Sequence, residues 1–359
     1  MDYENLINEQ LAAMDLDALE ELARLGEENP LGIEISSPVQ MIYSLLRGEL
    51  ILDPQMVLSN LASFFLQEIQ GSLLFGGEIL AVCIILSLLQ NLNTGLGEET
   101  AAKVASIACS CTIIALSLHN FLMVYRLCEN TVEQMTGAMQ LLLPIMTPLL
   151  LAMGKVTAGS VLNPLILGAI TLFATLMQRF VMPALFLSTV IFLGNSLTER
   201  EYIKKLAVFL RGAAIFLMGL CITLFSGISA LQGLVTRSAD GLLMKTARYS
   251  MDNFIPVAGR FASDSMDMVL SCTAMIKNGI GIFGVIILIC VMAVPLLKMA
   301  AVALIYKGIG ILAEPMGNRM VSDTMNQVGT TIITLAAVLL TSGILFIIFF
   351  AILINLGIS

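Results

Sequence analysis

Long runs of apolar residues dominate this chain, and only a few charged positions interrupt each run. A helix that crosses a membrane needs about 20 mostly apolar residues. Eight segments approach that length, at 73–92, 101–124, 139–153, 160–178, 180–196, 206–230, 279–303 and 327–356. The pattern therefore predicts an all-α protein, a polytopic integral membrane bundle of helices with about seven spans.

Two places in this pattern are expected to depart from a simple crossing. The segment 139–153 is short and contains Pro144 and Pro148, which favours a re-entrant or kinked helix. Arg179 separates the fourth segment from the fifth. Because an arginine at the centre of a spanning helix costs about 2.5–3.5 kcal/mol on insertion scales, we expect a tight turn at Arg179.

The first 72 residues have a more polar pattern. Residues 1–35 carry ten acidic side chains and a single base, Arg24, which predicts an acidic, solvated N-terminal segment. Apolar residues recur at helical spacing over 36–72. This spacing predicts amphipathic helices that lie on the membrane surface.

A weak internal similarity divides the remainder of the chain. A shift of 112 residues superposes Pro144 on Pro256 and Pro183 on Pro295. We interpret this as an internal duplication, with chance similarity between apolar segments as the alternative. The remainder then divides into a first membrane helical pair and two membrane repeats, at 73–136, 137–248 and 249–359.

The composition agrees with a membrane protein and excludes several other classes. The chain is 58% hydrophobic and 12% charged, whereas a soluble domain has about 25% charged residues. A net charge of -8 leaves no basic face for nucleic acid. The single histidine, His119, cannot form a zinc site, which needs three or four ligands. We expect no metal site and no cofactor.

The sequence also lacks the motifs of common enzymes. It has no nucleophile elbow, no H-E-x-x-H, no Walker loop and no G-x-G-x-x-G after a strand. We therefore expect a protein that catalyses no reaction. Without a Walker loop the chain cannot itself drive transport with ATP.

The segment 254–288 is the strongest candidate for a functional site. It joins a polar, amphipathic run directly to an apolar span rich in glycine. Asp264 and Asp267 are three residues apart and share one helical face. Polar groups and a loosened helix at this boundary indicate a cavity, a pore wall or a partner surface, and a solvated helix face is the alternative.

The glycines of this segment allow two interpretations. Lys277, Asn278 and Gly279 could open a helix whose N–H groups meet an anionic group. Glycines at this spacing also permit close packing of helices. The candidate pore or partner contacts are Pro256, Gly259, Asp264, Asp267, Lys277, Asn278, Gly281, Gly284 and Pro295, with Pro144, Pro148, Asn163 and Pro164 in the first repeat.

A resemblance to a known family rests mainly on the same segment. The sequence contains IPVAG, then SDSMDMVLSCTAMIKNGIGIFG, then Pro295 and Tyr306. The elements ISSPVQMIYSLLRGEL, LSLLQNL and SGISALQG fit the same pattern. The chain resembles the stage III sporulation protein AE family of endospore-forming Firmicutes, from about residue 36 to near its end.

The resemblance implies a multi-pass protein of the mother-cell membrane that surrounds the forespore. It implies a scaffold or conduit wall in a channel or secretion-like complex that links mother cell and forespore. The implied partners, besides the lipid bilayer, are other stage III sporulation A proteins and a forespore membrane protein, with a separate ATPase supplying energy. The duplication and the interrupted spans favour an alternative, a stand-alone secondary transporter of a small solute.

Overall fold

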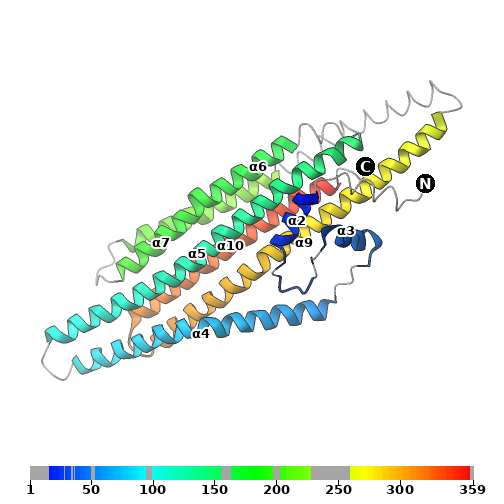
Figure 1. Ribbon diagram of the computed structural model, residues 1–359. Coiled ribbons are helices and arrows are strands. Elements are labelled where there is room, and N and C mark those ends of the chain that lie inside the picture. Colours follow the sequence, from blue (N-terminus) through cyan, green and yellow to red (C-terminus); the bar gives the residue numbers. More distant parts are fainter. Residues whose placement is uncertain are drawn as a thin grey trace.

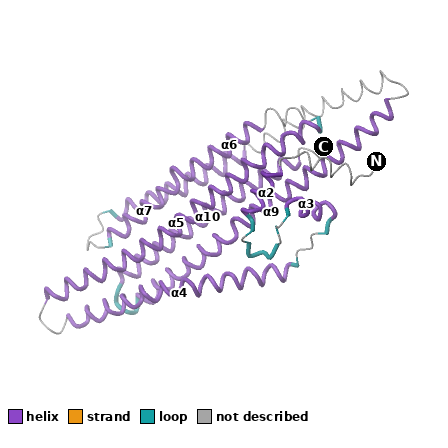
Figure 2. Tube along the Cα trace, in the orientation of Figure 1, coloured by secondary structure: helices purple, strands orange, loops and turns teal. Residues whose placement is uncertain are grey.

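The computed structural model describes residues 16–27, 29–33, 35, 37–49, 53–93, 99–154, 163–196, 203–227 and 259–355. Within these residues every regular element is a helix, and the helices run side by side in an elongated bundle (Figures 1 and 2). The prediction of an all-α bundle is confirmed.

Four helices are long, and the remaining ones are shorter or follow one another closely. The long helices are α4 (Pro54–Asn93), α5 (Glu99–Ala152), α9 (Gly259–Ala313) and α10 (Arg319–Asn355). The other elements are α2 (Leu16–Leu25), α3 (Pro38–Arg47), α6 (Asn163–Leu176), the π-helical turn η2 (Met177–Val181), α7 (Met182–Asn195) and the helix Lys204–Gly227.

Six helices in the described part of the chain are long and apolar enough to cross a membrane. The eight candidate segments become six helices because two pairs of them merge. The second and third segments both belong to α5, and the fourth and fifth belong to the continuous helical stretch α6–η2–α7. The predicted multi-pass membrane protein, with about seven spans, agrees with this arrangement.

The sequence allowed a re-entrant or a kinked helix at 139–153. The re-entrant alternative is wrong, because these residues are the last part of α5, and the kink stays a prediction. Pro144 and Pro148 are exposed on the outer face of the helix. Leu142 and Met146 are buried on the opposite face, against the rest of the bundle. A helix also keeps most backbone groups hydrogen-bonded where no water can reach them, so packing and environment together maintain it past the prolines.

The expected tight turn at Arg179 is also wrong. Arg179 lies in η2, and its side chain is exposed on the bundle surface. Pro183, four residues later, has no N–H to donate to the carbonyl group of Arg179. A π turn takes up this defect, since the N–H of Met182 bonds the carbonyl of Met177, and the helix continues.

The core of the bundle is formed by α5, α9 and α10. The turn at 314–318 connects α9 to α10, and α5 packs against both. The hydroxyl of Tyr306 on α9 donates to the carbonyl oxygen of Ser117 on α5 at 2.8 Å. The thiol of Cys128 on α5 donates to the carbonyl oxygen of Leu335 on α10 at 3.5 Å.

The other helices cover this core. On one side α4 lies along α9, and Asn318 donates to the carbonyl oxygen of Cys83 on α4 at 3.4 Å. On the other side Phe173 of α6 meets Phe225 and Phe346 edge to face, with ring centroids 5.3 and 6.0 Å apart. These contacts attach α6 and the helix Lys204–Gly227 to α10.

The bundle is longer than a bilayer is thick. α5 and α9 have 54 and 55 residues, which at 1.5 Å per residue makes each about 80 Å long. The hydrocarbon core of a bilayer is about 30 Å thick. Large parts of both helices therefore lie outside it. Arg126, Glu129 and Glu133 separate two apolar stretches of α5.

The division into five parts stays a prediction, since residues 1–15 and 228–258 lie outside the described chain. Two facts bear on it. α4 begins at Pro54, inside the segment expected to lie on the membrane surface, and continues to Asn93. Each proposed repeat contains a helical hairpin, which is α6–η2–α7 with Lys204–Gly227 in the first and α9 with α10 in the second.

Candidate functional site

The predicted boundary between polar and apolar residues lies inside one uninterrupted helix. α9 runs from Gly259 to Ala313, so the expectation that Lys277, Asn278 and Gly279 open a helix is wrong. Gly279 instead allows α9 to contact α3, because a Cβ atom at this position would lie 3.2 Å from the side chain of Ile42 on α3. The missing side chain lets α3 approach α9, and the α9 backbone stays helical.

Lys277 is completely buried and closes the end of α10. Its Nζ donates to the carbonyl oxygen of Ile354 at 2.8 Å and to that of Leu353 at 3.2 Å. The last carbonyl groups of a helix have no partners within the helix, and they carry the negative end of its dipole. A lysine ammonium group can donate hydrogen bonds to these carbonyl groups, and its positive charge is favourable beside the negative end of the dipole. Lys277 therefore has a structural role and joins α9 to α10.

Gly281 and Gly284 bring α9 into close contact with α5 and α10. A Cβ atom at Gly284 would lie 2.7 Å from Leu142 on α5 and 3.0 Å from the Phe350 ring on α10. A Cβ atom at Gly281 would meet Met146 on α5 at 3.4 Å and would overlap the side chain of Ile354 on α10. Gly281 and Gly284 therefore serve close helix packing, one of the two interpretations that the sequence allows.

These contacts bring the two candidate segments together. Leu142 and Met146 belong to the first candidate segment, 141–168, and Gly281 and Gly284 belong to the second, 254–284. The two segments meet at the end of the bundle where α10 ends. Their role in a pore or a partner contact stays a prediction.

The remaining candidate residues are dispersed. Asn278 is half-buried, and its Oδ1 has no hydrogen-bond partner among the described residues. Pro295 is buried within α9. Asp264 and Asp267 lie in the first turns of α9, and Asn163 begins α6, but these side chains lie outside the described part. Pro256 lies outside it altogether, Gly259 begins α9, and Pro164 is exposed.

The sequence did not identify a second polar cluster, located halfway along the bundle. Lys298 Nζ on α9 lies 3.8 Å from Glu68 Oε2 on α4, and Glu78 lies on the same face of α4. The available signals were Lys298 and Glu78, charged side chains within the predicted spans 279–303 and 73–92. A charged side chain in a span requires a partner, and that rule could have led to Glu68.

Another polar contact lies between α7, the helix Lys204–Gly227 and α10. Arg211 is half-buried, and its guanidinium group donates to Gln327 Oε1 at 2.7 Å. Ser188 on α7 donates to the carbonyl oxygen of Ala207 at 2.7 Å. Across residues whose side chains are described, no group of three or more His, Cys, Asp and Glu could hold a metal ion.

Six apolar helices, close packing through glycine and a few paired charges define a multi-pass helical membrane protein. The family model described as Stage III sporulation protein AE matches residues 36–357. A curated protein named Stage III sporulation protein AE, from Bacillus subtilis (strain 168), is 31% identical over 319 residues, which is 88% of this chain and 79% of that protein. The chain belongs to the stage III sporulation protein AE family, and no solved structure matches it.

Proposed function

We propose that the chain is a membrane subunit of a channel or secretion-like complex that links mother cell and forespore. It serves there as a non-catalytic scaffold or conduit wall, in the mother-cell membrane around the forespore. Its partners are the other stage III sporulation A proteins and a forespore membrane protein. Membership of a sporulation family over residues 36–357 supports this proposal.

One structural observation supports a scaffold in particular. Lys277 meets the last turn of α10, so residues 259–276 of α9 extend beyond α10 (Figure 1). At 1.5 Å per residue this α9 extension is roughly 27 Å long. Its sequence carries Arg260, Asp264 and Asp267. A charged helical extension at the end of an apolar bundle suits contact with another subunit better than contact with lipid tails.

Charge reversal on the α9 extension tests the proposal. We expect a protein with both Asp264→Lys and Asp267→Lys to insert into the membrane normally. Complex assembly or late gene expression in the forespore should then fail. The control is Glu314→Lys, an exposed carboxylate in the turn between α9 and α10, at the other end of the bundle. Normal sporulation in the double variant would refute the assignment of Asp264 and Asp267 to a functional site.

A second candidate function, a stand-alone secondary transporter, is favoured by a cavity between α4, α5 and α9. Its wall contains charged side chains halfway along the bundle, where transporters place their binding sites. Purified protein in liposomes distinguishes the two functions. Solute flux without any partner protein supports the transporter, whereas flux that requires the partners supports the complex.

A further inference from the structure

A cavity of about 570 Å³ lies between α4, α5 and α9. All three helices are among those long and apolar enough to span a membrane. Binding sites for small molecules are commonly about 300–1,000 Å³ in volume, mostly apolar, with a few placed polar groups. Gly71 and Glu78 on α4 and Met123 on α5 line the cavity and are exposed, so it opens on the outer surface of the bundle.

The charges in the cavity wall do not balance. The wall contains two carboxylates, Glu68 and Glu78, and one base, Lys298. Lys298 lies 3.8 Å from Glu68, and no described residue forms an ion pair with Glu78. One negative charge therefore remains in a site bounded by three spanning helices. A carboxylate in such a place is costly unless a cation accompanies it.

The geometry of the wall indicates which kind of cation fits. Glu68 and Glu78 are ten residues apart on one face of α4, which is roughly 15 Å along the helix axis. Phe75 on α4 and Val124 and Leu127 on α5 line the same cavity. The unpaired carboxylate thus adjoins a long and largely apolar wall.

A divalent inorganic cation fits this wall poorly. Calcium takes six to eight oxygen ligands, and magnesium requires an octahedral set, whereas Glu78 is the single carboxylate of the wall without a described partner. An anion fits no better, because the single base of the wall already faces Glu68. A monovalent organic cation with an apolar chain matches both the charge and the volume.

We propose that this cavity binds an amphiphilic ligand with an ammonium group, held by the carboxylate of Glu78, with its apolar chain along Phe75, Val124 and Leu127. Such a ligand can be an amine solute or the headgroup of an aminophospholipid in the surrounding bilayer. In both cases an ammonium group meets Glu78, and the lipid headgroup carries a phosphate in addition. The proposal is independent of the α9 extension, which lies outside the cavity.

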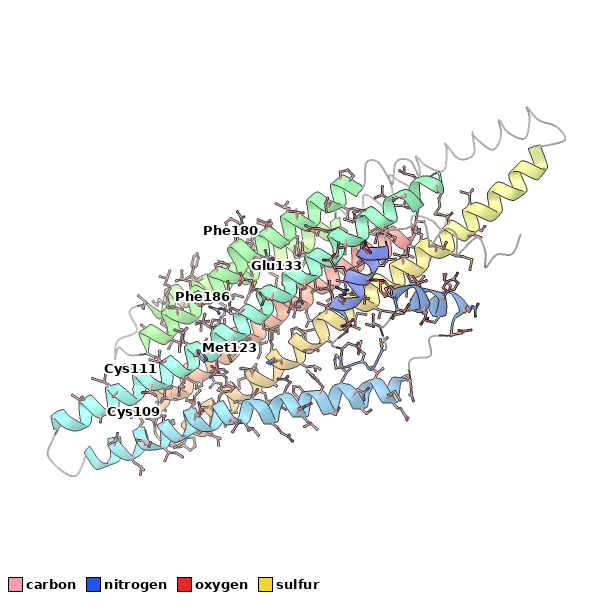
Figure 3. All side chains as sticks on the ribbon, viewed as in Figure 1. Cys109, Cys111, Met123, Glu133, Phe180 and Phe186 are labelled. Carbon is pink, nitrogen blue, oxygen red and sulfur yellow. The ribbon has the colours of Figure 1, made fainter. Side chains whose placement is uncertain are left out.

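Hexylammonium chloride is a suitable probe for the purified full chain in detergent. We expect saturable binding of hexylammonium, measured by calorimetry, and at least tenfold weaker binding of hexanoate and of hexanol. Glu78→Gln should weaken hexylammonium binding at least tenfold. The matched control is Glu133→Gln, an exposed carboxylate on α5 outside the cavity wall, and this variant should bind as the unmodified protein does (Figure 3).

A second pair of variants tests the cavity without changing any charge. Gly71 lines the cavity, and a Cβ atom there would meet nothing within 4 Å, so we expect the larger side chain of Gly71→Leu to occupy part of the cavity. Gly77 is equally open, on the same helix, but outside the cavity wall. We expect Gly71→Leu to weaken hexylammonium binding at least tenfold and Gly77→Leu to leave it unchanged.

Hexylammonium binding that survives Gly71→Leu would overturn the proposal, and so would hexanoate binding of equal strength. If Glu78→Gln does not fold, the comparison of Gly71→Leu with Gly77→Leu tests the proposal in its place. Nanodiscs then distinguish the two sources of the ligand. Displacement of hexylammonium by phosphatidylethanolamine, but not by phosphatidylglycerol, identifies a lipid headgroup as the ligand. If phosphatidylethanolamine does not displace hexylammonium, the ligand is an amine solute.

Discussion

The ammonium group of Lys277 lies 2.8 Å from the carbonyl oxygen of Ile354, so a buried lysine on α9 closes the C-terminus of α10. Burying a charged group is costly unless it is hydrogen-bonded, and here two carbonyl groups accept from it. The contact fixes the register between the two helices. It also marks the residue from which α9 extends beyond the bundle.

Replacing this lysine tests that role. We expect Lys277→Met to lower the free energy of unfolding by about 1.5–3 kcal/mol, because hydrogen bonds from a charged donor are lost and two carbonyl groups lose a partner. Amide hydrogen exchange in the last turn of α10 should become faster. Thermal unfolding in detergent and exchange mass spectrometry measure the two effects. Lys205→Met, an exposed lysine on another helix, should change neither.

The contact between α9 and α5 at Gly284 allows a matched comparison on one helix. Gly284→Val should lower the free energy of unfolding by about 1–3 kcal/mol, because the new side chain overlaps Leu142 and Phe350. A Cβ atom at Gly308, also on α9, would meet nothing within 4 Å. Gly308→Val should therefore be close to neutral. Equal losses of stability in the two variants would contradict the packing described for α5, α9 and α10.

A hydrogen bond attaches the helix Lys204–Gly227 to the core. Arg211 donates to Gln327 on α10 at 2.7 Å, and a double-mutant cycle with Arg211→Ala and Gln327→Ala measures their coupling. We expect a coupling energy of about 1.5–3 kcal/mol, as for a hydrogen bond to a charged group. Thr341 on α10 lies about 21 Å from Gln327 along the helix axis. The effects of Arg211→Ala and Thr341→Ala on the free energy of unfolding should therefore be additive. If the effects of Arg211→Ala and Gln327→Ala are also additive, the contact between Arg211 and Gln327 is refuted.

The sequence predicted the fold class because apolar runs of spanning length are a direct consequence of the bilayer. It predicted too many separate segments for a local reason. Pro144 and Pro148 are residues that tend to break helices, and Arg179 is a charged residue within an apolar stretch. Tertiary packing decides whether a helix continues past them. The exposed prolines of α5 and the π turn before Pro183 show two ways in which it does so.

The candidate site was predicted less completely, since its partners are distant in sequence. The polar character of Lys277 was visible, but its partners Leu353 and Ile354 lie 76 and 77 residues away and act through backbone carbonyls. A sequence pattern contains no information on which backbone group lies where. The same applies to Glu68 and Lys298, whose side chains meet across 230 positions of the chain.

The number of crossings is the central claim, and labelling of single introduced cysteines measures it most directly. In a variant without the seven native cysteines, Gln55→Cys, Glu314→Cys and Asn355→Cys each present an exposed position at a helix end. Intact cells and inverted vesicles are treated with a membrane-impermeant maleimide. Six crossings predict that positions 55 and 355 label from one face and position 314 from the other. Labelling of positions 55 and 355 from opposite faces would require an odd number of crossings and contradict the six-helix bundle.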